Sequence, residues 1–472
     1  MFKKRLVLRY VLLALGISGW AAAAMAQRPE PDAFLNQQRA ITDLIRQERE
    51  KLSPVTEDTQ FDYGGSYSFF LFLYDDGVNS SRTFRRHDLR LWARLGLDKG
   101  AHEFYARGRL SFVDFNPGDQ FEEEDDVDGM NLERGFYKFD LAKAMLASSG
   151  TRIDYNVEFK IGRDFTQFGT GYALSTPLDQ VLLRATLHDL ELTGLMGKTI
   201  GSSQDFDQVR NPERTRRTFF GLQAKYRGLA RHEPFAYVLW QRDHNRDVVP
   251  DTVQKFDYDS FYVGLGSTGE IVPRLRYSTE WVAETGRSFS SGATVRRNNI
   301  AAWAWDLELE YLFNYKGRPR VGFEYMFASG DADRIVSPTS TIGGNSKGFK
   351  DTSFIGFGFR DTGLSFAPRL SNVHIWRLGG SFYPLEDHPK FNRLQLGTNW
   401  FLYHKHRSNA AVSDPTATDQ SGYLGWEMDY FANWEVTTDF SATARYGVFF
   451  PGDAFPDETT RTFLLLGFTW NF

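Results

Sequence analysis

The sequence predicts an all-β fold: a transmembrane antiparallel β-barrel of about eighteen strands, with long extracellular loops and short periplasmic turns. Three observations support this fold class. First, 16% of the residues are aromatic, although only 41% are hydrophobic and the mean hydropathy is -0.43. Second, apolar and polar residues alternate from about residue 60 onward. Third, the chain ends on a strand-like segment whose last residue is Phe472.

Residues 1–26 have the pattern of a cleaved signal peptide. Four basic residues precede an uncharged run that closes with Ala24-Met25-Ala26, an A-x-A cleavage pattern. A membrane anchor is the alternative, which the cleavage pattern disfavours. Removing the four cations would take the net charge from -5 to -9, a poor match to nucleic acid. The chain has no cysteine, which excludes disulfides, thiol catalysis and cysteine metal sites.

Residues 27–58 are predicted to be a separate N-terminal periplasmic segment that contains a short amphipathic helix, and residues 59–472 are predicted to be the barrel. Phe34, Ile41 and Ile45 recur at near-helical spacing with charges between them. This segment could insert into the lumen, dock to a periplasmic partner or form a mobile arm. The sequence alone leaves these alternatives open.

Alternation with a period of two defines the predicted strands. In 421–437, for example, the predicted lipid-facing set contains Leu424, Trp426 and Met428. The predicted spans are 60–74, 84–97, 101–114, 130–141, 152–164, 178–186, 188–198, 216–228, 233–245, 256–268, 271–286, 297–315, 318–329, 371–383, 391–404, 421–437, 439–450 and 460–472. With both termini periplasmic, the long connectors fall outside and most short ones inside, as expected for an outer-membrane barrel. The inner turns 142–151 and 384–390 are exceptions, since both are rather long.

The last predicted strand carries a distinctive end. Leu464, Leu466, Phe468, Trp470 and Phe472 alternate onto one face, and the terminal aromatic resembles the signal that the barrel-insertion machinery reads. Ten of the 11 tryptophans fall inside predicted strands, where aromatic belts at the membrane interfaces would place many of them.

Charges on the lipid face at mid-depth cost several kcal/mol, so the polar parity of each strand must point into the lumen. This argument predicts the following pore-lining or substrate-contacting residues: Arg86, Arg90, Arg94, Arg107, Arg109, Arg134, Lys160, Arg184, Arg274, Arg276, Arg393, Arg445, Glu158, Glu280, Asp306 and Glu308. They could simply brace a wet lumen with ion pairs. They could instead form a cationic track for an anionic solute, because Arg pairs bidentately with carboxylates. Interleaved acids would keep each site weak enough for the solute to leave.

Two long loops and the nine histidines are the remaining candidates for a functional role. Residues 115–131 contain seven acids, which suit a solvated loop or a loop that binds divalent cations or lipopolysaccharide. Residues 330–370 are expected to fold over the outer mouth or into the lumen. The nine histidines match no catalytic motif, so we expect no enzyme activity, no cofactor and no metal site. A hydrolase would need His188 or His244 beside a nucleophile.

Several segments resemble the alginate export family of outer-membrane porins. They are FKIGRDFTQFGTGYALSTPLDQV at 159–181, RRTFFGLQAKY at 216–226 and FEYMFASGD at 323–331. The resemblance implies a monomeric cationic pore through which a uronic-acid polymer leaves the periplasm, with loops that gate its mouths. It also implies a constriction lined by arginines, for which the nearest candidates are Arg90, Arg109, Arg134, Arg163 and Arg445. Strict alternation places Arg163 on the lipid face, and neither the N-terminal helix nor the acidic loop matches the family.

Together, these observations predict a bacterial outer-membrane porin that passively conducts an alginate-like polyuronate out of the periplasm. The alternative is a general or sugar-acid uptake porin of similar architecture, and an outer-membrane hydrolase or structural barrel is a third possibility. The expected partners are the anionic polysaccharide, outer-membrane lipids, lipopolysaccharide and periplasmic export proteins, but no nucleic acid.

Overall fold

The computed structural model describes residues 46, 55, 57–77, 81–118, 125–200, 216–244, 258–289, 297–334 and 350–472. The predicted signal peptide and most of the predicted N-terminal helix lie outside the described residues, as do parts of the loops at 115–131, 199–215 and 330–370. Among the described residues, no helix is long and apolar enough to cross a bilayer.

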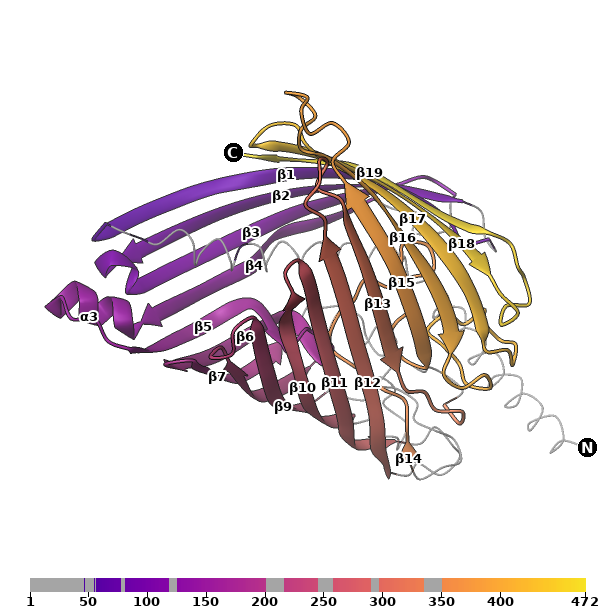
Figure 1. Cartoon of the computed structure of the whole chain (residues 1–472), viewed down its shortest axis with the longest axis horizontal. Coiled ribbons are helices and arrows are strands. Elements are labelled where there is room, and N and C mark those ends of the chain that lie inside the picture. Colours follow the sequence, from indigo (N-terminus) through magenta and orange to yellow (C-terminus); the bar gives the residue numbers. More distant parts are fainter. Residues whose placement is uncertain are drawn as a thin grey trace, which may run out of the picture.

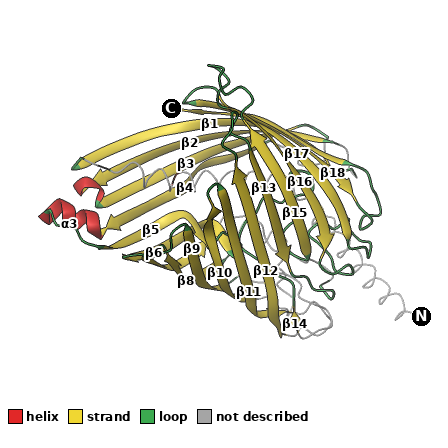
Figure 2. Ribbon diagram, viewed as in Figure 1, coloured by secondary structure: helices red, strands yellow, loops and turns green. Residues whose placement is uncertain are grey.

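The described residues form one antiparallel sheet closed into a barrel (Figures 1 and 2). The wall strands are β1 (Thr59–Asp75), β2 (Arg82–Leu97), β3 (His102–Phe115), β4 (Asp126–Asp140), β5 (Tyr155–Phe168), β6 (Leu174–Leu187), β7 (Leu190–Thr199), β8 (Arg217–Tyr226), β9 (His232–Asp243), β10 (Asp259–Val272), β11 (Leu275–Phe289), β12 (Arg297–Leu312), β13 (Arg320–Ala328), β15 (Val373–Phe382), β16 (Leu394–Lys405), β17 (Tyr423–Glu435), β18 (Phe440–Pro451) and β19 (Arg461–Asn471). The two-residue β14 (Lys350–Asp351) pairs in parallel with β12 and does not belong to the wall. The prediction of eighteen strands is therefore confirmed, and each predicted boundary lies within four residues of the observed one.

Closure of the sheet depends on the two ends of the barrel sequence. β1 pairs with β19 from Ser66 opposite Asn471 to Asp75 opposite Thr462. Beyond this ladder, Gly65 and Phe472 exchange two backbone hydrogen bonds, of 2.8 and 3.0 Å. The terminal residue thus completes the seam, and every wall strand has a partner on both sides.

Short turns gather at one end of the barrel and long loops at the other, so the short-turn end is periplasmic by the outer-membrane rule. The predicted long turn at 142–151 is explained by a helix, α3 (Leu141–Ser149), at the left of Figure 1. The Asp140 side chain caps its N-terminus by accepting a hydrogen bond from the Lys143 backbone N–H, and Gly150 ends it in the left-handed region at φ 69°. A 3-10 turn, η1 (Asp98–Gly100), joins β2 to β3.

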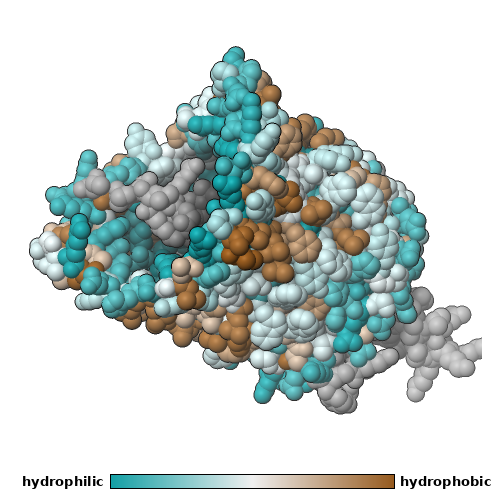
Figure 3. Space-filling model, viewed as in Figure 1, coloured by the Kyte–Doolittle hydropathy of each residue, from teal (hydrophilic) through white to brown (hydrophobic). Residues whose placement is uncertain are grey.

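The outer face carries the apolar parity of each strand. Leu466, Trp470 and Phe472 are 43, 51 and 57% exposed, as expected for side chains that face lipid. Figure 3 shows hydrophobic residues gathered over the middle of the visible strands and hydrophilic residues toward the ends. Leu424 corrects the sequence prediction: it is fully buried, because the ladder between β16 and β17 shifts register at Tyr403 and His404 and breaks the alternation there.

A hydrophobic core lies inside the barrel rather than between two sheets. Residues 350–372 belong to the connection between β13 and β15. They bring Phe354, Phe357 and Phe366 into one buried cluster with inner-wall residues. Residues 169–173, between β5 and β6, add Tyr172 and Ala173 to that cluster. We call 169–173 and 350–372 the inserted segments. They pack on the inner wall, so residues 350–372 of the connection between β13 and β15 fold into the lumen.

The assignment of the lipid face predicts the effect of a misplaced charge. Leu466→Arg should lower the free energy of unfolding by about 2–4 kcal/mol, because it would place a cation in hydrocarbon near mid-depth. Urea titration of the barrel in lipid vesicles, followed by heat-modifiable gel migration, measures this. Thr443→Arg, at the same depth in the neighbouring strand but on the inner parity, is the matched control. Equal losses in both variants would contradict the assignment.

Candidate functional site: a basic wall opposite the inserted segments

The inner parity of β2 to β5 carries a continuous set of cations, which we call the basic wall. Its members are Arg86, Arg90, Arg94, Arg107, Arg109, Arg134, Lys138 and Lys160. The ladder places Arg90 directly opposite Arg109, and Arg107 opposite Arg134. Like charges in directly opposite positions destabilise a sheet, so this wall requires carboxylates between its cations.

Glu133 lies at the centre of the basic wall, and the sequence analysis missed it. Its carboxylate is 2.7 Å from Arg107 Nε, 3.2 Å from Arg90 Nε and 3.9 Å from Arg109 Nη1. Arg134 faces inward, so its neighbour Glu133 would face outward in a regular strand. A register shift between β3 and β4, just after Arg107, instead lets the Glu133 side chain reach the inner cations. Strict alternation would have pointed Glu133 outward, and the only available signal was that a lipid-facing Glu is unfavourable.

Three further acids lie beneath the cations. Asp88 pairs with Arg86 and Arg90 at 3.1 and 3.4 Å. Glu103 pairs with Lys138 and Arg94 at 3.0 and 3.3 Å. The side chains of these two acids are 2 and 0% exposed, whereas those of Lys138 and Arg90 are 16 and 19% exposed.

The third acid, Asp164, is fully buried and lies 2.8 Å from Lys160 Nζ and 3.9 Å from Arg134 Nε. With Glu133, the wall thus holds four carboxylates that are at most 9% exposed, and a fifth, Asp128, is 43% exposed and lies 3.1 Å from Arg109. Eight cations therefore meet five acids. An excess of positive charge remains on the partly exposed side of the wall, where it can attract an anion.

The inner parity of β11 to β17 has the opposite character. Glu280, Glu284, Asp306 and Glu427 are buried there beneath the inserted segments. Glu427 accepts the backbone N–H groups of Leu364, Ser365 and Phe366 at 2.6, 2.7 and 2.8 Å. Glu284 accepts the N–H of Ile355 at 2.9 Å. These carboxylates therefore satisfy the backbone of a loop that has left water.

Two predicted pore-lining acids need correction for this reason. Glu280 accepts the Thr170 backbone N–H at 2.5 Å, and Asp306 lies 3.0 Å from Arg360. Both carboxylates are fully buried, so they hold the inserted segments and do not line the pore. Burial alone would lower the pKa of the Arg360 guanidinium, but the charge of Asp306 raises it, and Arg360 stays a cation.

Arg377 is a second functional residue that the sequence analysis missed. It lies 2.7 Å from Glu324, 3.3 Å from Glu308 and 3.4 Å from Asp361. It therefore ties β12, β13 and β15 to the inserted segment. Glu308 keeps 39% side-chain exposure and remains a lumenal acid. The alternation of Trp376 and Leu378 outward was the signal that could have placed Arg377 inside.

The remaining predicted residues lie away from the basic wall. Arg184 pairs with Glu158 at 3.1 Å on the inner parity nearer the periplasmic end. Arg445 is on the inner parity of β18, 5.6 Å from the Phe431 ring. Arg163 is on the outer parity, where it pairs with Asp179 at 2.7 Å, as strict alternation predicts.

Arg274 and Arg393 are corrections, since each precedes its strand and lies exposed in a periplasmic turn. Alternation does not hold in these turns, because the chain there lacks the strand geometry that sends successive side chains to opposite faces.

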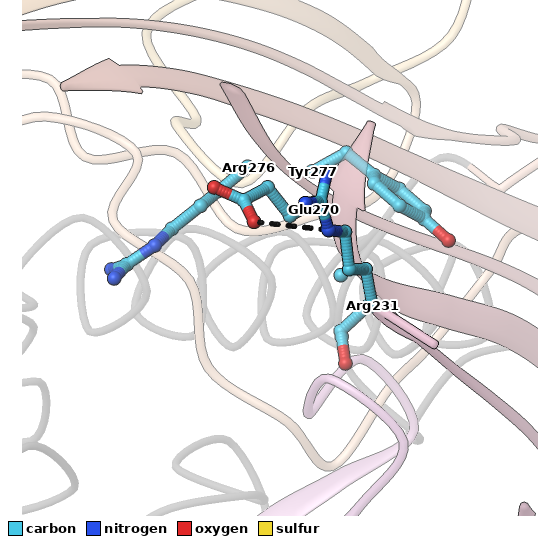
Figure 4. Close-up of a pocket in the computed structure, with 6 residues that line it drawn as sticks. Arg231, Glu270, Arg276 and Tyr277 are labelled. Atoms are coloured by element: carbon cyan, nitrogen blue, oxygen red, sulfur yellow. Dashed lines mark ion pairs between the residues drawn. The ribbon is translucent and has the colours of Figure 1, made fainter. Parts of the chain in front are cut away.

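Arg276 lines a small pocket at the periplasmic end, together with Arg231, Glu270 and Tyr277. Figure 4 shows the ion pair in this pocket, in which Arg231 Nε lies 4.0 Å from Glu270 Oε2. The pocket combines two cations with one acid at the mouth through which a periplasmic solute would enter.

The described residues contain no group of three His, Asp or Glu side chains that could hold a metal ion. Residues 119–124 of the acidic loop lie outside the described part of the chain, so the suggested divalent-cation role of that loop stays a prediction. The described geometry thus offers charged surfaces for a solute.

Known structures share this architecture. The chain is similar to the Pseudomonas aeruginosa porin OccK5 (OpdH), with a TM-score of 0.54, 13% identity and coverage of 89% of this chain and 100% of that one. It is also similar to OccK11 (OpdR) of the same organism, with a TM-score of 0.51, 13% identity and coverage of 89 and 98%. At this identity the likeness shows the fold alone, that of a porin barrel. None of the curated proteins compared with the chain matches it.

A family model supplies the remaining evidence. The model described as "Alginate export" matches residues 203–464, more than half of the chain. Family and fold together place the protein in the bacterial outer membrane as a porin-type channel. The chain belongs to the alginate export family.

Proposed function

We propose that the barrel passively conducts an anionic polysaccharide, an alginate-like polyuronate, out of the periplasm along the basic wall. The observation that carries this proposal is the layering of charge on β2 to β5, where buried acids lie beneath partly exposed cations. A polymer of carboxylates would meet Arg and Lys at successive positions rather than one deep site. Conduction requires such weak, repeated binding.

The inserted segments support passage along one side of the lumen. They pack on inner-wall residues of strands that include β8 to β10 and β1, β2 and β19 as well as β11 to β17. They bury acids such as Glu280, Asp306 and Glu427, which would otherwise repel a polyanion, while Glu308 stays partly exposed. The cations of the basic wall, in contrast, keep partial exposure. A passive route of this kind needs no cofactor and no catalytic residue.

The inserted segments narrow the lumen, which also suits a smaller solute. Uptake of a sugar acid is therefore the second candidate function. The size of the blocking solute distinguishes the two. Block that strengthens with each added uronate unit favours the polymer, because a chain contacts several cations at once. Block by the monomer that does not grow with length favours the small acid.

Arg90 and Arg109 face each other across β2 and β3 and should contribute most to anion selectivity. In planar bilayers, Arg90→Gln with Arg109→Gln should weaken block by oligouronates at least about tenfold, since a hydrogen bond to a charged group contributes about 1.5–3 kcal/mol. The reversal potential in a salt gradient should shift toward cations. Arg85→Gln removes a partly exposed arginine of the outer parity, which pairs with Asp114, and is the matched control. Cation selectivity of the unaltered protein would reject the proposal.

Glu133→Gln should make the channel more selective for anions, because it removes the negative charge shared by Arg90, Arg107 and Arg109. It should also cost about 3–5 kcal/mol of stability, as expected when one partner of a buried ion cluster is neutralised. Reversal potentials and urea titration measure the two effects. Glu158→Gln is the control. The Glu158 side chain, which pairs with Arg184, is 28% exposed, so this variant should change the reversal potential and the stability much less. An unchanged reversal potential would show that Glu133 does not face the ion path.

Glu427→Gln should loosen the inserted segment, because the carboxylate that accepts three backbone N–H groups becomes a neutral amide. Each charge-assisted hydrogen bond contributes about 1.5–3 kcal/mol, so the variant should show frequent transitions between conductance levels. Single-channel recording measures the transition rate. Glu435→Gln, at an acid of the same strand that is 65% exposed and pairs with Arg393, is the control. If Glu427→Gln gives a channel of normal conductance without added transitions, the inserted segment does not control gating.

A further inference from the structure

Three of the nine histidines gather on the outer face of the barrel at its extracellular end. His374 in β15 lies directly opposite His404 in β16, and His406 follows β16. The ring centres of His374 and His406 are 5.6 Å apart. The first two have the outer parity, because their neighbours Ile375 and Tyr403 belong to the core inside the barrel. All three side chains are partly exposed, and we call them the imidazole patch.

Aromatic side chains surround the imidazole patch on the outer wall, where β13, β15 and β16 lie side by side (Figure 1). The Phe327 ring centre lies 4.8 Å from that of His374 and 5.0 Å from that of His406. The Trp376 ring centre lies 5.8 Å from that of His374 and 5.6 Å from that of His404. Tryptophan gathers where a membrane meets water, so the patch lies at the level of the lipid head groups.

The patch presents imidazole nitrogens to the outside. The Tyr325 hydroxyl contacts Nδ1 of His374 at 2.7 Å, and Nε2 of this ring has no hydrogen-bond partner among the described residues. Within the described part of the chain, the rings of His404 and His406 have no such partner either. No three of the described His, Asp and Glu side chains could hold a metal ion, so these rings are not a metal site. A polar group beside hydrocarbon is unfavourable without a partner, which points to a ligand from the membrane.

Arg407 adds a permanent positive charge beside the patch. Its side chain is exposed, and its Nε donates to the Gly330 carbonyl at 3.0 Å. Burial lowers the pKa of His406, which lies in the loop after β16, and the Arg407 charge lowers this pKa further. His406 is therefore neutral near pH 7 until an anion arrives. A bound anion would favour the protonated ring, and protonation would in turn favour the anion.

We propose that the imidazole patch and Arg407 form a docking surface for the phosphate groups of lipopolysaccharide in the outer leaflet. This lipid brings phosphates to the head-group level, directly above acyl chains that would meet the aromatic rings. A cation and imidazole N–H groups suit a phosphate, because hydrogen bonds between charged partners are the strong ones. Basic clusters at a membrane surface recognise anionic head groups in the same way. The surface faces lipid, so the proposal goes beyond the proposed function and does not depend on the conducted solute.

Acid should tighten this binding through the imidazoles. Between about pH 7.5 and about pH 5.5, histidine is the side chain that gains a proton. Titratable neighbours on the adjoining strands and loops keep their ordinary charge in this range; they are Tyr325, Lys405, Arg407, Asp419, Tyr423 and Asp453. Lys405 in addition has the inner parity, where its Nζ donates to the Ala417 and Asp419 carbonyls at 3.1 and 2.8 Å.

Native mass spectrometry of the folded full chain with purified lipopolysaccharide tests the surface. The triple variant His374→Gln, His404→Gln, His406→Gln should bind this lipid at least about tenfold more weakly at about pH 5.5, because it loses hydrogen bonds from charged groups. It should also lose the tightening between about pH 7.5 and about pH 5.5. Equal affinities of the triple variant and the unaltered chain would overturn the proposal.

His102→Gln with His232→Gln is the matched control. These histidines also have the outer parity, but they lie at the periplasmic end, where Tyr137 and Tyr277 contact them at 2.7 and 3.0 Å. The double variant should bind lipopolysaccharide as the unaltered chain does. An equal loss in the control and in the triple variant would show a general effect on the barrel surface and would overturn the proposal.

His406→Lys tests the surface without removing a ring from a strand. A permanent cation at this position should tighten binding at about pH 7.5 and reduce the difference from about pH 5.5. Heat-modifiable gel migration reports that each variant is folded. If folded His406→Lys binds the lipid no more tightly than the unaltered chain at about pH 7.5, the proposal is wrong.

Two further probes identify the group that binds. Lipopolysaccharide treated with phosphatase should bind the unaltered chain as weakly as the intact lipid binds the triple variant. Equal binding of treated and intact lipid would assign the contact to the acyl chains and overturn the phosphate assignment. Inorganic phosphate that bound as tightly as the lipid would reveal a free-anion site and overturn the lipid assignment. None of these outcomes bears on ion selectivity or oligouronate block, which test the proposed function separately.

Discussion

The structure depends on the need to pair every backbone polar group that lies in hydrocarbon. No water is available there, so a sheet must close on itself, and here it does so through the β1–β19 ladder and the two hydrogen bonds between Gly65 and Phe472. Closure creates an inside and an outside, and the period of two then sends each residue to one or the other. The distribution of charge in the lumen follows from this constraint.

Two parts of the inner wall handle their charges differently. On β2 to β5, acids such as Glu133 and Asp164 are buried under cations that keep contact with the lumen. On β11 to β17, acids such as Glu427 are buried under a loop and bind its backbone. Both arrangements compensate buried carboxylates, and among the described residues the cations of the basic wall keep partial exposure. The inserted segments therefore occupy part of the lumen.

Sequence reasoning was accurate where period and local signals agree. The outward set of the last strand, the arginines of β2 and β3 and the outward position of Arg163 all follow from alternation. Alternation failed at irregularities of the ladder, where a register shift gives access to the other face. Glu133 was missed beside one such shift, and Leu424 was placed on the wrong face beside another. A bulge depends on the partner strand, so one strand's own pattern does not reveal it.

The sequence by itself determined the barrel, its strand number, its lipid face and the inward direction of most charges, because these follow from local periodicity and the cost of charge in lipid. Only the tertiary structure decided which inward charges stay available. Glu280 and Asp306 have the same parity as a pore-lining residue, yet distant segments around Thr170 and Arg360 cover them. The contact of Arg46 with Asp164, 118 residues apart, is of the same kind. Burial by a distant part of the chain has no periodic signature, since it depends on how loops and termini fill a space that exists only after the sheet has closed.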